Sequence, residues 1–380
     1  MAAPLRDRVA VVGVGCTRFG ERYEERTEDL VCAAVDEALA DAGCERERVE
    51  AAWVGTVLSP FGGDALADAL KLFGRPVTRV HNYCASGMDA FRGACLAVAA
   101  GQHDVALAVG VEKMRDGGFA RPNRSHPVLD FGERAPHVFA LSAHRYFARF
   151  GATKKTLAAV AVKNHRHGLA SPKAHLRMEV SEDAVLRAPM VYSPLGLYDC
   201  CPTTDGAAAV LVCRADLARS FRATPVWPLG VGLAVVSGQP YWKPSAGFVG
   251  FEATVRAAAQ AYAQAGVGPA DVDFAEVHDC FTITEILTYE DLGFCRRGEG
   301  GRFVEEGRAS LGGEKPVNPS GGLKSFGHPV GATGARMIWE VVTQLRGEAG
   351  ARQVRNARIG LAHNLGGPGA VSCVSILTNA

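Results

Sequence analysis

Three short motifs, far apart in the chain, carry side chains that could together transfer an acyl group. They are NYCASG at 82–87, HDCF at 278–281 and GHP at 327–329, and a fourth segment, HNLGG, follows at 363–367. The motifs supply a thiol nucleophile, a base to activate it and a second thiol that can move a proton. Together they indicate acyl transfer through a thioester.

Cys84 is the candidate nucleophile. It follows a short extended segment at 78–82 and precedes a helix expected over about 85–100. Unpaired backbone N–H groups at a helix start lower a thiol pKa from roughly 8.5 and can hold an oxyanion. Gly87 would allow another backbone to approach closely. On this motif alone, the alternative is a buried cysteine at a helix start.

His328 is the candidate base, held between Gly327 and Pro329. The run 318–334 is so rich in Gly and Pro that it predicts a loop with no regular element. A residue before proline avoids the helical region, which would present the imidazole to a pocket. The alternative is a histidine that only holds the loop.

His278 and Cys280 follow a strand expected at 272–277. The carboxyl ends of strands in α/β proteins line the usual ligand crevice, so these side chains are expected at the site. The alternatives are a turn histidine and a core cysteine. The absence of HExxH, CxxC and GxSxG patterns argues against a metal centre and a serine hydrolase. We therefore predict no metal and no permanently bound cofactor.

Composition narrows the class of protein further. The chain has 380 residues, a net charge of +1 and eleven cysteines. Near-neutral charge argues against nucleic acid or a membrane as partner. An odd number of cysteines without CxxC spacing indicates a reducing compartment. With no apolar run of membrane-spanning length, the sequence predicts a cytoplasmic protein.

Short β-branched runs alternate with Ala-rich helical stretches, which is typical of an α/β fold. In the first half we expect strands at 9–14, 51–57, 78–82, 104–111 and 207–213, with helices at 28–41 and 85–100. In the second half we expect strands at 227–236, 272–277, 357–362 and 371–377, with helices at 251–265 and 331–346. The repeated order predicts an internal duplication.

Residues 117–201 interrupt this pattern with many prolines and two expected helices, at 142–150 and 154–164. Between 115 and 177 there are twelve Lys and Arg against three acidic residues. The segment is therefore a candidate lid over a polyanionic small molecule or an RNA-binding face, and the alternative is a solvated surface. The candidate phosphate-binding residues are Lys154, Lys155, Lys163 and Arg166.

Taken together, the motifs resemble the thiolase superfamily from end to end, and most of all its sterol-carrier-protein type. CASG around Cys84 matches the nucleophile motif, HDCF replaces the more usual NEAF, and NPSGG precedes GHP. HNLGG stands where most members carry CxG. Asn364 thus replaces a cysteine, which fits a subgroup in which Cys280 takes over its role.

The resemblance implies an α/β thiolase fold with two five-stranded βαβαβαββ halves in five αβαβα layers. The implied domains are an N-terminal half (1–116 with 202–222), a lid (117–201) and a C-terminal half (223–380). It also implies a homodimer, with a tetramer or a complex with a small OB-fold protein as further possibilities.

The resemblance also implies the chemistry. Cys84 would attack an acyl-CoA or 3-ketoacyl-CoA, His328 would accept its proton, and Cys280 would exchange a proton with the second substrate. One oxyanion hole would come from the N–H groups of Cys84 and Gly366, and the other from His278 and His328. Coenzyme A is then a substrate, and its phosphates are the polyanion for the basic segment.

Three alternatives remain open. One is a thiolase-like retro-aldolase, whose members typically lack the nucleophilic cysteine that Cys84 provides here. Another is a ketosynthase-like subunit of a complex with an OB-fold partner. The last is a non-catalytic protein that binds CoA or RNA, which would leave the three motifs unexplained.

Overall fold

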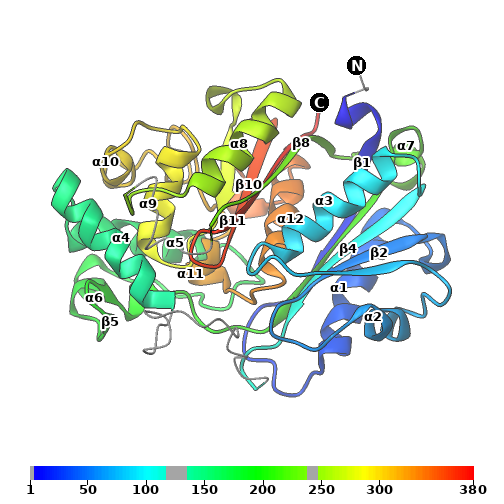
Figure 1. The fold of residues 1–380 in the computed structure, drawn as a ribbon, viewed down its shortest axis with the longest axis horizontal. Coiled ribbons are helices and arrows are strands. Elements are labelled where there is room, and N and C mark those ends of the chain that lie inside the picture. The colour runs from blue at the N-terminus through cyan, green and yellow to red at the C-terminus, as the bar shows by residue number, and fades with distance from the viewer. Residues whose placement is uncertain (1–3, 117–134, 238–246) are drawn as a thin grey trace.

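Two β-sheets form the framework of the protein (Figure 1). The structure is a computed structural model and describes residues 4–116, 135–237 and 247–380. In spatial order, the first sheet contains β1 (Val9–Cys16), β7 (Gly206–Arg214), β4 (Val105–Glu112), β2 (Ala51–Gly55) and β3 (Val77–Val80). The second contains β8 (Trp227–Val235), β11 (Val371–Thr378), β10 (Ile359–Gly366) and β9 (Phe274–Val277).

The two sheets repeat one pattern of strand directions. Each begins with two antiparallel pairs, β1–β7–β4 and β8–β11–β10, and continues with a parallel pair, β4–β2 and β10–β9. A 3-10 helix directly precedes β2 and β9, at Arg46–Arg48 and Pro269–Asp271. The expected duplication is therefore confirmed.

The expectation of five strands in the second half is wrong for the part of the chain that the structure describes. The place equivalent to β3 is taken by Val317, which makes one parallel bridge to Ala275. Pro316 has no N–H to extend the ladder, and Asn318 turns the chain with a φ of 55°. The fifth strand is thereby reduced to a single bridge.

Helices complete five layers, α-β-α-β-α (Figure 1). The outer helix α1 (Thr27–Ala42) packs on β1 and β7, and α8 (Glu252–Ala265) packs on β8 and β11. Between the sheets, α3 (Ser86–Ala99) and α12 (Thr333–Leu345) contact each other. The five-layered α/β arrangement that the resemblance implied is confirmed.

Paired glycines bring each outer helix onto its sheet. A Cβ on Gly13 or Gly15 would lie 2.1 or 2.0 Å from a carbonyl oxygen of α1. On Gly230 or Gly232 it would lie 2.2 or 2.1 Å from a carbonyl oxygen of α8. Because such distances exclude any side chain, both halves use the same Gly-x-Gly spacing for the same close contact.

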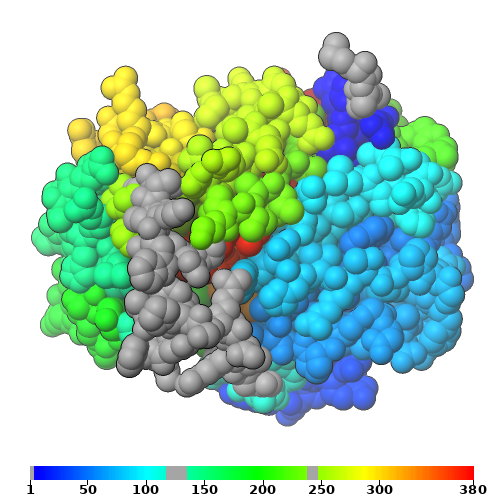
Figure 2. All heavy atoms as spheres, viewed as in Figure 1, coloured from blue at the N-terminus to red at the C-terminus, as the bar shows by residue number. Residues whose placement is uncertain are grey.

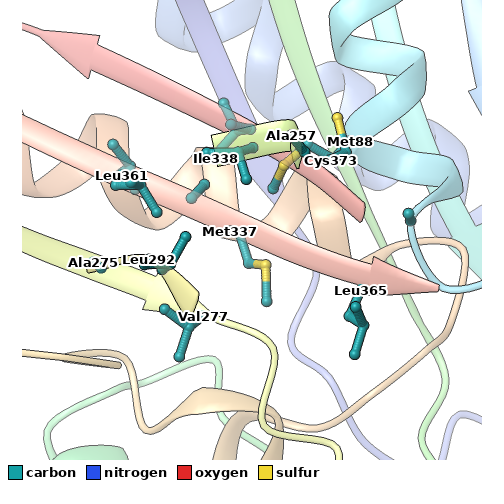
Figure 3. Close-up of a cluster of buried hydrophobic side chains, with 14 of the residues drawn as sticks. Met88, Ala257, Ala275, Val277, Leu292, Met337, Ile338, Leu361, Leu365 and Cys373 are labelled. Atoms are coloured by element: carbon teal, nitrogen blue, oxygen red, sulfur yellow. The ribbon is translucent and has the colours of Figure 1, made fainter. Parts of the chain in front are cut away.

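The central core lies between α12 and the second sheet. Figure 3 shows Met88 of α3 beside Cys373 of β11, and Met337 and Ile338 of α12 near Leu361 of β10, all of them buried. The apolar face of α12 thus supports the strands that end at the candidate site.

The insertion forms a helical group at one end of the molecule (Figures 1 and 2). Its elements are α4 (Ala135–Phe150), α5 (Lys154–Leu169), α6 (Glu182–Arg187) and the hairpin β5 (Met190–Tyr192) with β6 (Leu195–Gly196). They pack with α9 (Thr282–Asp291) and α10 (Gly300–Glu305). Among the described helices, none has the length and apolar character needed to cross a membrane.

The Gly-rich run corrects a second expectation. It contains a short helix, α11 (Gly322–Phe326), where we expected no regular element. Asp279 stabilises its first turn, because the carboxylate accepts hydrogen bonds from the backbone N–H groups of Leu323 and Lys324, at 2.6 and 3.2 Å.

Replacing Gly232 by alanine tests the close contact of α8. The new Cβ would lie 2.1 Å from the backbone oxygen of Ala257, so strand and helix must separate. We expect the free energy of unfolding, measured by urea denaturation, to fall by about 2 kcal/mol or more. Gly20→Ala, which meets no atom within 4 Å, is the control and should change little. Equal stability of both variants would contradict this account of the layer.

Candidate active site

The loop before α3 holds Cys84 in a fixed conformation. The hydroxyl of Ser86 accepts a hydrogen bond from the Asn82 N–H at 2.8 Å and donates one to the Tyr83 carbonyl at 2.6 Å. Tyr83 has a positive φ of 50°, a conformation in which non-glycine residues are uncommon. Asp89 accepts from the Asn82 amide at 2.6 Å. The first turn of α3 thus positions the thiol.

Three predicted residues converge in the structure. The Cys84 sulfur and one ring nitrogen from each of His278 and His328 lie within 4.8 Å of one another. The two rings meet edge to face, with centroids 5.0 Å apart. They come from the loop before α3, the end of β9 and the loop before α12. This arrangement places a thiol beside two imidazoles, and either can supply the adjacent base that nucleophilic catalysis requires.

The Cys84 thiol is neutral at rest. Burial raises its pKa to about 12, although hydrogen bonds from the backbone N–H groups of Gly367 and of Cys84 itself act in the opposite direction. The expectation of a lowered thiol pKa is therefore wrong for the ligand-free protein, because removal from water outweighs the helix start. Cys84 accordingly needs a base.

His328 is available as that base. Burial lowers its pKa to about 3, with a further contribution from the charge of Arg336, so the ring is neutral. Its Nδ1 lies 2.7 Å from the hydroxyl of Thr333, which donates to the carbonyl of Pro329 at 2.9 Å. Sequence analysis missed Thr333, although it lies one helical turn beyond the motif.

His278 is also buried and neutral. Burial lowers its pKa well below the usual range, and His328 and His363 add to the effect. Its Nδ1 lies 3.0 Å from the side-chain amide nitrogen of Asn364. Asn364 occupies the position of the cysteine in a CxG motif. Sequence analysis noted only this replacement, whereas in the structure the Asn364 side chain contacts the site directly.

Cys280 lies next to this group. Burial raises the pKa of its thiol well above the usual range, and the neighbouring Cys201 and Cys84 raise it further. The thiol lies 3.7 Å from the Thr284 hydroxyl, within hydrogen-bonding distance for sulfur. The Cys201 N–H donates to the Cys280 carbonyl at 2.9 Å, so a third thiol adjoins the site. No local sequence signal indicated Cys201.

Gly366 was predicted to donate to an oxyanion. It ends β10 against the nucleophile loop, where a Cβ would lie 2.5 Å from the Asn82 oxygen. In the structure it is the Gly367 N–H that bonds to the Cys84 thiol. The role of Gly366 stays a prediction, and Gly367 is a second candidate donor.

Glu112 ties the loop after β2 to the loop before α12. Its buried carboxylate accepts hydrogen bonds from Thr56 and from the backbone N–H groups of Val57, Leu58, Ser59 and Gly331. Burial raises its pKa, and these bonds oppose the rise. Sequence analysis missed this residue because its partners lie more than 50 positions away.

Two of the four predicted phosphate ligands are already paired inside the protein. Lys163 is 5 % exposed, and its ammonium lies 2.8 Å from the Glu285 carboxylate and 2.8 Å from the Val317 carbonyl. Lys154 pairs with the buried Asp199. These internal pairs neutralise both charges, which argues against phosphate contacts by Lys163 and Lys154, and their role stays a prediction.

The other two basic residues are exposed. Arg166 lines an open pocket of about 560 Å³ between α5 and α6. The remaining lining residues are Val162, Glu179, Val180, Ser181, Glu182, Ala184 and Tyr198. Lys155 lies 3.9 Å from Glu182 at the surface. Arg166 is therefore a predicted phosphate-binding residue that lines a cavity.

Family comparisons agree with this geometry. The family description "Thiolase, N-terminal domain" matches residues 9–216, and "Thiolase C-terminal domain-like" matches residues 242–379. The chain belongs to the thiolase family. This confirms the resemblance that the motifs indicated.

Individual relatives cover nearly the whole thiolase chain. An acetyl-CoA acetyltransferase of Methanothermobacter thermautotrophicus is 42 % identical, with 98 % of this chain and 100 % of the relative aligned. Sterol carrier protein 2 of Bos taurus is 36 % identical, with 97 % and 72 % aligned. The solved structure titled Ltp2-ChsH2(DUF35) aldolase superposes with a TM-score of 0.90 at 26 % identity, covering 99 % of both chains.

The buried Lys163–Glu285 pair leads to a stability prediction. Lys163→Met leaves the fully buried Glu285 without its ammonium partner, so we expect a loss of about 3–5 kcal/mol in the free energy of unfolding. Lys155→Met, at a side chain that is 72 % exposed, is the matched control and should leave thermal and urea midpoints unchanged. A Lys163→Met protein as stable as the parent would restore this lysine as a candidate ligand.

Proposed function

We propose that this thiolase-family protein is an acyl-CoA acyltransferase that works through an acyl-enzyme on Cys84. The observation that carries the proposal is the convergence of a neutral thiol with two neutral imidazoles within 4.8 Å. It catalyses reversible thiolysis of a 3-ketoacyl-CoA or, in the other direction, Claisen condensation of two acyl-CoA molecules.

In the first half-reaction, His328 takes the thiol proton as the Cys84 sulfur attacks the 3-keto carbon. Cleavage of the C2–C3 bond leaves the acyl group on sulfur and releases an acetyl-CoA enolate. Cys280, whose raised pKa keeps it protonated, gives its proton to C2 of that enolate.

In the second half-reaction, an incoming CoA thiol returns a proton to Cys280 and attacks the acyl-enzyme. Acyl-CoA leaves, and the Cys84 sulfur recovers its proton from His328. The N–H groups of Cys84 and of Gly366 or Gly367 hold one oxyanion. His278 donates to the other, joined by His328 once that ring carries the proton taken from Cys84.

The structural likeness to an aldolase supports one competing function. Retro-aldol cleavage needs a base and an enolate site but no nucleophile that becomes acylated. The placement of the Cys84 thiol beside a neutral imidazole favours acyl transfer, and a covalent acyl adduct separates the two functions. A ketosynthase-like subunit would form the adduct yet need a partner protein, and a non-catalytic CoA-binding protein would form none.

Coenzyme A is proposed to bind along the insertion, which we define as 117–201 between the two halves, 1–116 with 202–222 and 223–380. Arg166 supplies an exposed positive charge at the pocket between α5 and α6, and Ser181 and Tyr198 add hydroxyl groups. Glu179 and Glu182 line the same pocket, and their negative charges do not favour an anion. The proposed phosphate contact therefore depends on Arg166.

The proposed homodimer has a structural basis in β3. This strand lies at the edge of the first sheet, and its four residues are exposed or half-buried. An uncovered edge strand can pair with a second copy of itself, which would extend the sheet across two subunits. Since β3 leads into the Cys84 loop, such pairing would place the two sites near the interface.

Acyl-enzyme formation is the decisive test. We expect intact-mass and peptide mass spectrometry to find an acetyl group on the Cys84 peptide after brief incubation with acetyl-CoA or acetoacetyl-CoA. Cys84→Ala should abolish the adduct. Cys280→Ala should still form it, but should lose turnover of acetoacetyl-CoA because the enolate lacks its proton donor. Normal turnover by Cys280→Ala would contradict the role of that thiol.

Arg166→Gln tests the proposed CoA contact. Loss of an exposed ion pair costs at most about 1 kcal/mol, so we expect KM for CoA to rise about 2- to 5-fold with kcat unchanged. Added salt should reduce the difference. Arg256→Gln, an exposed arginine on α8, is the control. If both variants show the parent KM, Arg166 belongs to the solvated surface.

A further inference from the structure

The two imidazoles at the thiol have different hydrogen-bond partners. Both rings use Nδ1 for a contact to a side chain, which leaves Nε2 of each ring for the reactants. A neutral imidazole carries its proton on one nitrogen alone, so the partner of Nδ1 decides what Nε2 can do.

At His278 the partner is a donor. The Asn364 amide nitrogen lies 3.0 Å from Nδ1, and an amide NH2 group can only donate. Nδ1 must then carry the lone pair, and the proton of the neutral ring is on Nε2. His278 therefore faces the reactants with an N–H.

At His328 the partner is an acceptor. The Thr333 hydroxyl gives its one proton to the Pro329 carbonyl at 2.9 Å and turns a lone pair toward Nδ1 at 2.7 Å. Nδ1 then carries the ring proton, and Nε2 has the lone pair. His328 is thereby the ring that can accept a proton from Cys84.

We propose that Asn364 and Thr333 are positioning residues that hold His278 and His328 in opposite tautomers, and so divide the roles of oxyanion donor and base between two otherwise similar imidazoles. The inference rests on the proposed acyl transfer for its catalytic meaning. The tautomers themselves can be measured in the resting protein.

Neighbouring groups support this assignment. Among the residues that the structure describes, no carboxylate is hydrogen-bonded to either ring to favour an imidazolium, and burial favours the neutral form of both rings. The charged group acting on both from a packed element is Arg336 of α12, which also opposes protonation. His363, behind His278, is neutral for the same reason, since burial lowers its pKa to about 3.

Histidine-selective 15N NMR of the unliganded protein tests the tautomers directly. We expect His278 to show a proton on Nε2 and His328 a proton on Nδ1, with signals assigned by their loss in His278→Gln and His328→Gln. The same tautomer in both rings, or the reverse pair, would overturn the proposal. Because this measurement needs no turnover, it stands apart from the acyl-adduct experiment that tests the function.

Asn364→Asp gives a kinetic signature that loss of packing would not. A carboxylate can only accept, so neutral His278 must move its proton to Nδ1 and lose the Nε2 donor. We expect kcat to fall about 100-fold or more at mildly alkaline pH. In mildly acidic solution the ring becomes an imidazolium beside the new carboxylate and regains its Nε2 proton, so the defect should shrink.

A matched substitution and a conservative variant complete the test. Asn379→Asp, on an amide that donates to the Leu345 and Ala357 carbonyls away from the site, should show the parent pH profile. Thr333→Ser keeps the hydroxyl and should retain activity, whereas Thr333→Val should lower kcat with little change in KM. A pH-independent defect in Asn364→Asp, or full activity in Thr333→Val, would contradict the proposal.

Discussion

The close approach of α3 and α12 is the constraint on which the site depends. A Cβ on Gly87 would lie 2.4 Å from the Gly331 carbonyl, and one on Gly334 would lie 2.3 Å from the Met88 nitrogen. The segments that carry Cys84 and His328 lead directly into these two helices. Because the helix starts touch through glycine, the thiol and the imidazole must lie side by side, although they come from different halves of the duplicated fold.

A buried polar network fixes the insertion to the same site. Asn164 of α5 donates to the carboxylates of Asp279 and Glu285, at 2.8 and 2.6 Å. His167, one turn further along α5, bonds through Nδ1 to the Asn318 carbonyl at 2.9 Å. Moving α5 outward would remove the Asn164 donor from both buried carboxylates and the Lys163 ammonium from Glu285, and each loss inside a buried network costs more than an exposed hydrogen bond. The helix is therefore a wall of the site, and Arg166 lies on its exposed face.

Local signals predicted those features that depend on neighbours in sequence. Alternation of strands and helices gave the layers, and motifs at element ends gave Cys84, His278 and His328. Features set by distant partners could not be predicted. In the sequence, Lys163 has the character of a surface lysine. The carboxylate that neutralises it belongs to Glu285, which lies far along the chain. The prediction of a lowered thiol pKa took account of the helix start but not of burial, which has the larger effect.

The resting site holds four reactive groups, the buried His278, Cys280 and His328 and the half-buried Cys84, without a formal charge on any of them. Two thiols have raised pKa values and two imidazoles have lowered ones, all chiefly through burial. This avoids the cost of burying an ion pair before substrate is present. In the proposed acyl transfer, charge would appear only as the Cys84 sulfur attacks, and the N–H donors of Gly367 and His278 would already be in place for it. In such a neutral site, charge cannot distinguish a base from a hydrogen-bond donor. The distinction has to come from proton position, and hence from the residues that bond the far nitrogen of each ring.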